Sequence, residues 1–317
     1  MPRRHPLPPA LSGRPFLLSE ARALDVSRKV LRGRRMRRLF QGVYVEARIA
    51  DSLRVRVAGA LLVLPGDACV SHHTAAQIRD LPVPDDGCVH ATIRRVSQRP
   101  RIRGVTVHQA SAAPSVTWFA GFPVASPGQT FADLAAHLTL VDLTILGDAM
   151  IRRGFTTPDE LRRAVGAMDG RRGSQMARRS VSLVRQRVDS PMETWVRLLI
   201  VLAGLPCPEP GLEVLDDDGQ WVATVDLQYP AQRIAIEYDG DLHRTSRRKY
   251  QHTVATRERL RELGWEIIVL TAHDVMVRPH HMLRRIYERL RARGHPLLPP
   301  AIDPGWEACQ TRGRASA

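Results

Sequence analysis

The stretch that decides the fold consists of three short pieces: SPMETW at 190–195, VATVDL at 222–227 and IAIEYDGDLH at 234–243. The first piece predicts the beginning of a helix. Ser190 can cap it, Pro191 fits the first helical position, and Glu193 completes a capping box. Apolar residues then recur at helical spacing until Gly204, which can end the helix.

The second and third pieces alternate between apolar and polar residues, as strands do. Residues 229–232, with the sequence YPAQ, form a turn-prone connection between them. We therefore expect a hairpin in which Asp226 closes one strand and Glu237 closes the next. Such a hairpin would bring the two carboxylates to neighbouring positions on one rim.

Crowded carboxylates repel one another, so a cluster of them suggests a bound cation. Mg²⁺ takes one or two carboxylates together with waters and phosphate oxygens. We expect Asp226, Glu237 and Asp239 to supply such a site, with His243 as a general acid or base and Glu193 reaching in from the helix. The alternative, which spacing alone leaves open, is a capping role for Glu193 and surface positions for the other acids.

The order of these pieces, followed by R-x-x-L-x-x-x-G-W at 257–265, resembles the DUF559 endonuclease-like domain. That family is similar to very-short-patch-repair endonucleases of the PD-(D/E)XK restriction-endonuclease superfamily. The resemblance covers residues 186–293 and implies a buried central strand at 267–270. Five residues match the family's site, namely the helix acid Glu193, the metal-binding acids Asp226 and Glu237, Asp239 at the superfamily's lysine position, and His243 near the scissile phosphate. Four more match its later segment, namely Arg257, Leu260, Gly264 and Trp265.

The chain departs from this family pattern in two places. Residues 251–256, with the sequence QHTVAT, lack the acidic residue that members usually carry in the helix after the histidine loop. The zinc-binding cysteines of the repair enzymes are also absent. Cys69, Cys88, Cys207 and Cys309 are widely separated, so we expect no zinc site and free thiols.

Length and composition indicate a globular protein with more than one domain. The chain has 317 residues, of which 44% are hydrophobic and 25% charged. No apolar run is long enough to span a membrane, and the N-terminus lacks a signal-peptide pattern, so we expect a cytoplasmic protein without a membrane partner. The formal net charge of +15 favours an anionic polymer, DNA, as the partner.

Residues 1–48 concentrate this charge, with twelve Arg or Lys against three Asp or Glu. Ser19 is expected to cap a short helix through Leu24, Ser27 a second helix at 28–32, and a hairpin should follow around 41–42. This pattern predicts a winged helix-turn-helix and resembles the N-terminal domain of AbiEi-type antitoxins. The predicted DNA contacts are Arg28, Lys29, Arg32, Arg34, Arg35, Arg37 and Arg38.

Residues 49–185 form a middle region that resembles the second part of AbiEi-like proteins. Strands are predicted at 88–93 and 104–108 around a basic turn, and helices at 51–63, 72–80, 128–138, 141–153, 157 onward and 174–187. His72 and His73 follow Ser71 directly. Adjacent residues point to different faces of a helix, so we interpret this pair as structural or capping rather than metal-binding.

The predicted fold class is α/β (α+β). It combines a winged helix-turn-helix at 1–48, a mixed α/β middle region at 49–185, a restriction-endonuclease-like mixed sheet flanked by helices at 186–296, and a loosely ordered tail at 297–317. Two functions follow from this organisation. The first is a Mg²⁺- or Mn²⁺-dependent DNA endonuclease in which Arg244, Arg247, Arg248 and Lys249 grip the backbone.

The second function is a non-catalytic, DNA-binding regulator of antitoxin type, in which the nuclease fold is an inactive platform. The altered segment at 251–256 favours this alternative, whereas the retention of Asp226, Glu237, Asp239 and His243 favours the enzyme. The sequence leaves open whether the chain has a toxin partner or forms a homodimer.

Overall fold

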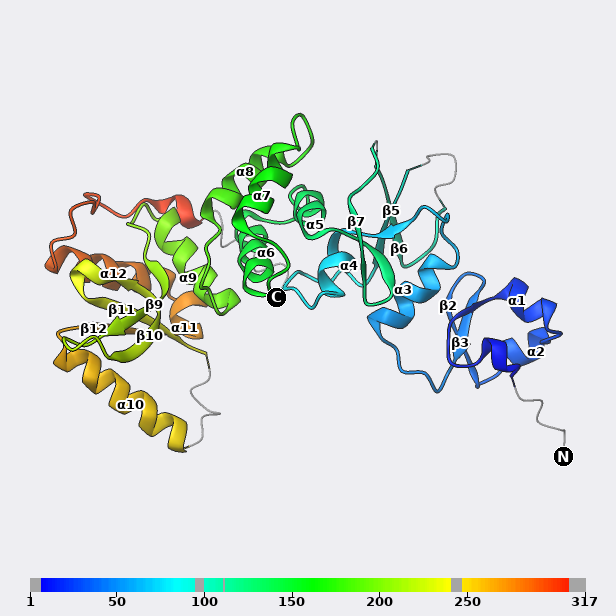
Figure 1. The fold of residues 1–317 in the computed structure, drawn as a ribbon, viewed down its shortest axis with the longest axis horizontal. Helices are drawn as coiled ribbons and strands as arrows, with labels where there is room; N and C mark the ends of the chain where they lie inside the picture. Colours follow the sequence, from blue (N-terminus) through cyan, green and yellow to red (C-terminus); the bar gives the residue numbers. More distant parts are fainter. Residues whose placement is uncertain (1–6, 95–99, 111, 241–246, 308–317) are drawn as a thin grey trace. The chain divides into compact units, whose positions relative to one another are not determined.

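The computed structural model describes residues 7–94, 100–110, 112–240 and 247–307 (Figure 1). Contacts divide the chain into two compact units, Met1–Leu134 and Ala135–Ala317, which we call unit 1 and unit 2. The division falls inside the middle region expected from the sequence, rather than at residue 48 or 185.

Unit 1 begins with two short helices and a three-stranded sheet. A 3-10 turn (η1, Pro9–Leu11) precedes α1 (Leu18–Ala23) and α2 (Arg28–Leu31). The sheet has the order β1 (Phe16–Leu17), β3 (Val43–Glu46), β2 (Met36–Phe40), so the expected hairpin is present. The cap of α1 differs from the prediction, because the Glu20 carboxylate, not Ser19, accepts the N–H of Leu17 at 2.7 Å.

A five-stranded sheet fills the rest of unit 1 in the order β6-β5-β4-β8-β7. Its strands are β4 (Cys69–Val70), β5 (Val89–Ile93), β6 (Val105–Gln109), β7 (Val116–Phe119) and β8 (Phe122–Ala125), and its helices are α3 (Leu53–Leu61), α4 (His72–Gln77) and α5 (Pro127–Leu134). The sequence predicted β5 and β6 but placed a basic turn between them. The two strands pair in parallel, so their connection is a crossover and not a hairpin turn.

The first part of unit 1 has a small core of its own, and its hairpin also enters the larger core of the five-stranded sheet. Phe40 and Val43 from the hairpin are buried together with Val57 and Ala60 of α3 and with the inner side chains of the five-stranded sheet. A Cβ added to Gly59 would lie 3.0 Å from the side chain of Leu39. The hairpin is therefore packed closely on α3.

Unit 2 opens with helices α6 (Leu140–Arg152), α7 (Pro158–Gly166) and α8 (Ser174–Leu183), followed by α9 (Pro191–Leu202). The predicted capping box of α7 is confirmed, with Thr157 Oγ1 accepting from Glu160 N and Glu160 accepting from Thr157 N. A buried ion pair joins α6 to α9. Asp148 Oδ2 lies 2.7 Å from Arg197 Nη2, and the two residues are 2% and 0% exposed.

The remainder of unit 2 is a four-stranded mixed sheet in the order β12-β11-β10-β9. Its strands are β9 (Glu209–Leu215), β10 (Trp221–Tyr229), β11 (Ile234–Asp239) and β12 (Glu266–Thr271), with η3 (Pro230–Gln232) between β10 and β11. Strands β9, β10 and β11 are antiparallel, whereas β12 is parallel to β11 after α10 (Arg247–Glu262). The strand at 267–270 was expected to be central, but β12 lies at an edge of this sheet.

Helices cover both faces of this sheet (Figure 1). On one face, α9 and α12 (Pro279–Ala292) bury a core that includes Val196, Ile236 and Met282. On the other face, Leu260 of α10 packs on Ala223, Val225 and Ala235. The short helix α11 (Ala272–Met276) links β12 to α12. A mixed sheet flanked by helices therefore carries Asp226, Glu237 and Asp239.

The segment after α12 corrects another expectation. Residues 297–317 were predicted to be loosely ordered, yet Trp306, in the 3-10 turn η4 (Pro304–Trp306), is only 1% exposed. It belongs to the same core as α9 and α12. The N–H of Asp303 also donates to the carbonyl of Ala203 at 2.9 Å. This segment consequently completes the core up to residue 306.

Across the residues that the structure describes, none of the helices combines the length and the apolar character that a transmembrane segment requires.

Candidate functional site

Asp226 and Glu237 face each other across the two central strands of the unit 2 sheet. Leu227 pairs with Ile236 in the antiparallel register of β10 and β11, which places Asp226 opposite Glu237 one step further along. Asp226 Oδ2 accepts the N–H of Tyr238 at 2.8 Å. The expected hairpin is present, but neither acid closes its strand, because β10 continues to Tyr229 and β11 to Asp239.

Glu193 lies in the first turn of α9 and is 6% exposed. Ser190 caps the helix as predicted, since its Oγ accepts the N–H of Glu193 at 3.2 Å. The carboxylate of Glu193 does not complete the expected capping box with Ser190. Instead its Oε2 accepts the N–H of Asp189 at 2.8 Å. A hydrogen bond from the backbone of Asp189, the residue before the cap Ser190, thus holds the buried Glu193 carboxylate.

Electrostatic repulsion links four acids, Asp189, Glu193, Asp226 and Glu237, which we call the acidic cluster. Burial, together with the charges of Asp226 and Asp189, raises the pKa of Glu193 to about 7 against the hydrogen bonds with Asp189 and Ser190 that lower it. Burial also raises the pKa of Asp226, together with repulsion from Glu237 and Asp189, against the hydrogen bond from Tyr238. A cation at this position would relieve the repulsion that both shifts record.

Arg257 of α10 supplies a positive charge on the Glu237 side of the acidic cluster. Its Nε and Nη2 lie 2.8 and 2.7 Å from Glu237 Oε2. Both side chains are about one-fifth exposed. The sequence matched Arg257 to the family's later segment but did not predict this ion pair, because the contact joins residues twenty positions apart. Asp189 was also missed, although it directly precedes the predicted cap Ser190.

The acidic cluster fits a metal ion with two carboxylate ligands better than one with three. Asp226, Glu237 and Asp239 are all described, yet they do not bring three ligand atoms within 4.8 Å of one another. Mg²⁺ usually keeps several waters and binds through one or two carboxylates. Asp226 and Glu237 are therefore the pair that could hold the ion, and Asp239, at the end of β11, does not complete a three-acid set in this structure.

Several predicted residues lie outside the described part of the chain. They are His243 and Arg244, and the side chains of Arg247, Arg248 and Lys249 at the beginning of α10. Of the residues predicted to contact DNA in unit 1, Arg37 is half-buried, with Nη1 3.1 Å from Asp51 Oδ1 and Nη2 donating to the carbonyl of Ile49. The other six are exposed, namely Arg28, Lys29, Arg32, Arg34, Arg35 and Arg38.

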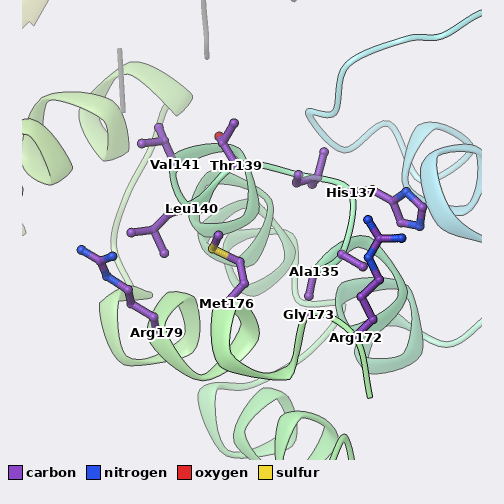
Figure 2. Close-up of a pocket in the computed structure, with 11 residues that line it drawn as sticks. Ala135, His137, Thr139, Leu140, Val141, Arg172, Gly173, Met176 and Arg179 are labelled. Carbon is purple, nitrogen blue, oxygen red and sulfur yellow. The ribbon is translucent and has the colours of Figure 1, made fainter. Parts of the chain in front are cut away.

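A pocket of about 610 Å³ lies elsewhere in unit 2 (Figure 2). Residues 135–141, which precede and begin α6, form part of its lining, and Arg172, Gly173, Met176 and Arg179 complete it from around α8. None of the acids of the acidic cluster lines this pocket. The pocket and the predicted site are thus separate features of the same unit.

Comparison with known proteins gives relatives without a stated activity. No protein-family model matches the chain. Two proteins of Mycobacterium tuberculosis are similar to it, Uncharacterized protein MT2308 of strain CDC 1551 / Oshkosh and Uncharacterized protein Rv2248 of strain ATCC 25618 / H37Rv. Each is 29% identical over 258 residues, which cover 81% of this chain and 93% of the relative. A match of this length exceeds either unit, so it includes residues of both.

Proposed function

We propose that the chain is a metal-dependent endonuclease that hydrolyses phosphodiester bonds in DNA, with Mg²⁺ or Mn²⁺ as its cofactor. The observation that carries this proposal is the pairing of Asp226 and Glu237 across the central strands β10 and β11, beside the buried Glu193. The mixed sheet flanked by helices is also the arrangement that the resemblance to restriction-endonuclease-like domains implies.

In this proposal the residues of the acidic cluster have different catalytic roles. Asp226 and Glu237 would hold the ion, which neutralises developing charge and lowers the pKa of a bound water. Glu193 has a pKa of about 7, close to the pH at which a general base exchanges protons most effectively. It can therefore accept a proton from the attacking water near neutral pH. His243 would assist the water or the leaving oxygen.

The proposed partner is duplex DNA, bound by the exposed basic residues of unit 1. Phosphate contacts from Arg and Lys side chains do not depend on base sequence and weaken as salt rises. Residues of α2 and of the loop before β2 supply most of these groups, including Arg28, Arg32 and Arg35. Binding in unit 1 would raise the local concentration of DNA for hydrolysis in unit 2.

A second candidate is a DNA-binding regulator in which the unit 2 fold is not catalytic. Its supporting observation is the ion pair of Arg257 with Glu237, because the guanidinium group already neutralises a carboxylate that the nuclease would use to bind a metal ion. Residues 251–256 also lack the acid that members of the resembled DUF559 family usually carry. In this alternative Arg257, rather than a cation, balances the charge of the acidic cluster.

Cleavage of supercoiled plasmid with and without Mg²⁺ or Mn²⁺ separates the two candidates. Asp226→Asn keeps the shape of the side chain but removes one charged ligand, so cleavage should fall by on the order of a hundredfold or more. DNA affinity should stay near that of the wild type. Asp218→Asn is the matched control, because Asp218 is an exposed acid in the turn between β9 and β10 and should leave the rate unchanged.

The outcomes assign the function unambiguously. If the wild type cuts no nucleic acid with any divalent ion yet binds DNA, the regulator is the correct function. If the wild type cuts and Asp226→Asn cuts equally well, the chain is a nuclease but the acidic cluster is not its active site.

A further inference from the structure

A group of metal-ligating side chains in unit 1 lies apart from the acidic cluster. It contains His73 of α4, Asp86 in the loop before β5, and His90 of β5. One ligand atom from each of these residues lies within 4.8 Å of those from the other two. Asp86 and His90 are four residues apart along the chain, and the packing of α4 against β5 brings His73 to them.

Hydrogen bonds fix the positions of these three residues. The N–H of His90 donates to Thr74 Oγ1 at 2.8 Å, which ties β5 to α4 next to His73. Asp86 Oδ1 accepts the N–H of Cys88 at 3.1 Å, so its other oxygen, Oδ2, points to His90 Nε2 at 2.7 Å. The rings of His73 and His90 are 4.9 Å apart between centroids and inclined at 52°. The ligand atoms are thus close enough to share one ion once a side-chain rotation widens the 2.7 Å contact between Asp86 and His90.

The second nitrogen of His90 has a partner that can set its protonation. His90 Nδ1 lies 2.9 Å from His108 Nε2 on the neighbouring strand β6. When Nδ1 donates to His108, the Nε2 atom presents a lone pair to the Asp86 carboxylate. In the other tautomer Nε2–H donates to Asp86 at 2.7 Å, and a bound cation would take the place of that proton. Metal-binding histidines are oriented as in the first tautomer, with the other ring nitrogen donating to a neighbouring acceptor.

We propose that His73, Asp86 and His90 bind a divalent transition-metal ion of the Zn²⁺ class. Two imidazole nitrogens and one carboxylate oxygen suit Zn²⁺, whereas Mg²⁺ prefers oxygen ligands alone. The Asp86 side chain is 47% exposed and that of His90 is 5% exposed. The site therefore opens to solvent on the Asp86 side, where water can complete a coordination sphere with three protein ligands.

The proposed site differs from two expectations drawn from the sequence. The absence of zinc was inferred from the spacing of the cysteines, but none of these ligands is a cysteine. His72 and His73 were interpreted as structural because adjacent residues point to different faces of a helix. The two side chains do have different neighbours. His72 Nδ1 lies 3.0 Å from Ser71 Oγ and 3.9 Å from Asp133, whereas His73 joins Asp86 and His90. Only one of the adjacent pair belongs to this ligand set.

The experiment measures zinc stoichiometry on the full chain carrying Asp226→Asn, which removes a ligand of the proposed Mg²⁺ site. Zn²⁺ is titrated in competition with a chromophoric chelator, and Co²⁺ is added separately as a spectroscopic probe of nitrogen and oxygen ligands. In this background His73→Ala and Asp86→Asn should each bind one equivalent of Zn²⁺ fewer than the parent. His281→Ala, at an exposed position of α12, should bind the same number as the parent.

Thermal unfolding separates loss of the ligand from loss of the fold. A ligand that binds the folded state raises the melting temperature, so Zn²⁺ should raise it in the parent and EDTA should reverse the shift. Asp86→Asn conserves shape at a half-exposed loop position, and its melting temperature in EDTA should equal that of the parent. The proposal is overturned if the parent binds no zinc at stoichiometric concentrations, or if both variants retain every equivalent. Neither result depends on nuclease activity.

Discussion

Glu193 illustrates how the surroundings of one residue set its charge. The residue is 6% exposed, and the neighbouring acids Asp226 and Asp189 add repulsion to the cost of burial. The folded protein therefore holds a proton on Glu193 up to a pH of about 7, whereas the unfolded chain releases it near 4.5. The folded state binds more protons in this interval, so its stability falls as pH rises through it.

We predict that Glu193→Gln flattens this pH dependence. In EDTA, the wild-type free energy of unfolding should fall between pH 4.5 and pH 7, with a contribution from Glu193 of about 3 kcal/mol, because each pKa unit corresponds to ~1.4 kcal/mol. The variant has no proton to lose at this position, so its curve should be flatter. Urea unfolding at several pH values measures both curves, and parallel curves would show that Glu193 does not titrate in this range.

The spacing of residues in the sequence predicted which polar residues belong to the site but not which side chains contact one another there. The helix cap at Ser190 and the facing positions of Asp226 and Glu237 follow from short-range signals, namely a capping residue and a two-residue alternation. The ion pair of Arg257 with Glu237 depends on how α10 packs over the sheet. Packing of this kind joins residues far apart in sequence, and a single sequence does not encode it in any local pattern.

At the scale of elements, the buried pair of Asp148 and Arg197 fixes α6 against α9. Asp148 also accepts hydrogen bonds from Thr194 Oγ1 at 2.8 Å and from the N–H of Arg185 at 2.7 Å. Arg197 donates to the carbonyl of Leu183 at 2.7 Å. Burial outweighs these interactions and raises the pKa of Asp148. The pair is therefore well connected but costly to desolvate.

We predict that Asp148→Ala destabilises unit 2 by about 3–5 kcal/mol, because it leaves the Arg197 charge buried and unpaired. Asp148→Leu combined with Arg197→Met should cost much less than the sum of the two single changes. Chemical unfolding of the single and double variants measures this coupling. Arg284→Ala is the control. Its partner Glu288 is on the same exposed face of α12, and the decrease in stability should be about 1 kcal/mol or less.

Prediction of the elements succeeded where capping or alternation was strong, and it missed several short strands and the seven-residue strand β9. Helix α7, with its capping box, and the strands β10 and β11 appear where they were expected. Strands β4, β7 and β8 were not predicted, since two to four residues do not establish a periodicity. The parallel pairing of β5 with β6 was also missed, because it depends on the whole sheet.

At the scale of the molecule, charge is distributed unevenly along the chain. Residues 1–48 contribute +9 of the net charge of +15. Testing this region by truncation would damage unit 1, because Phe40 and Val43 belong to its core. Substitution of exposed side chains leaves that core intact and is the better test of DNA binding.

We predict that replacing Arg28, Lys29, Arg32, Arg34 and Arg35 with Gln weakens DNA binding and reduces its salt dependence. The slope of log K against log salt should fall by ~0.9 for each phosphate group of duplex DNA that the variant no longer neutralises. Fluorescence anisotropy over a range of salt concentrations gives this slope. The control for net charge replaces five exposed arginines of unit 2 with Gln, namely Arg152, Arg162, Arg163, Arg284 and Arg291. An unchanged slope in the five-residue variant would place the DNA-binding surface elsewhere on the chain.

The burial of Trp306 has a consequence for synthesis on the ribosome. This side chain packs in a core that begins with Val196, 110 residues earlier in the chain. At a translation rate of ~5–20 residues per second, Trp306 is synthesised roughly 5–20 s after Val196. Until then the apolar face of α9 lacks the side chain that completes the core. During that interval the nascent chain exposes a surface that chaperones bind and proteases cut. We expect chains stalled before residue 304 to be digested in unit 2, and longer chains to resist.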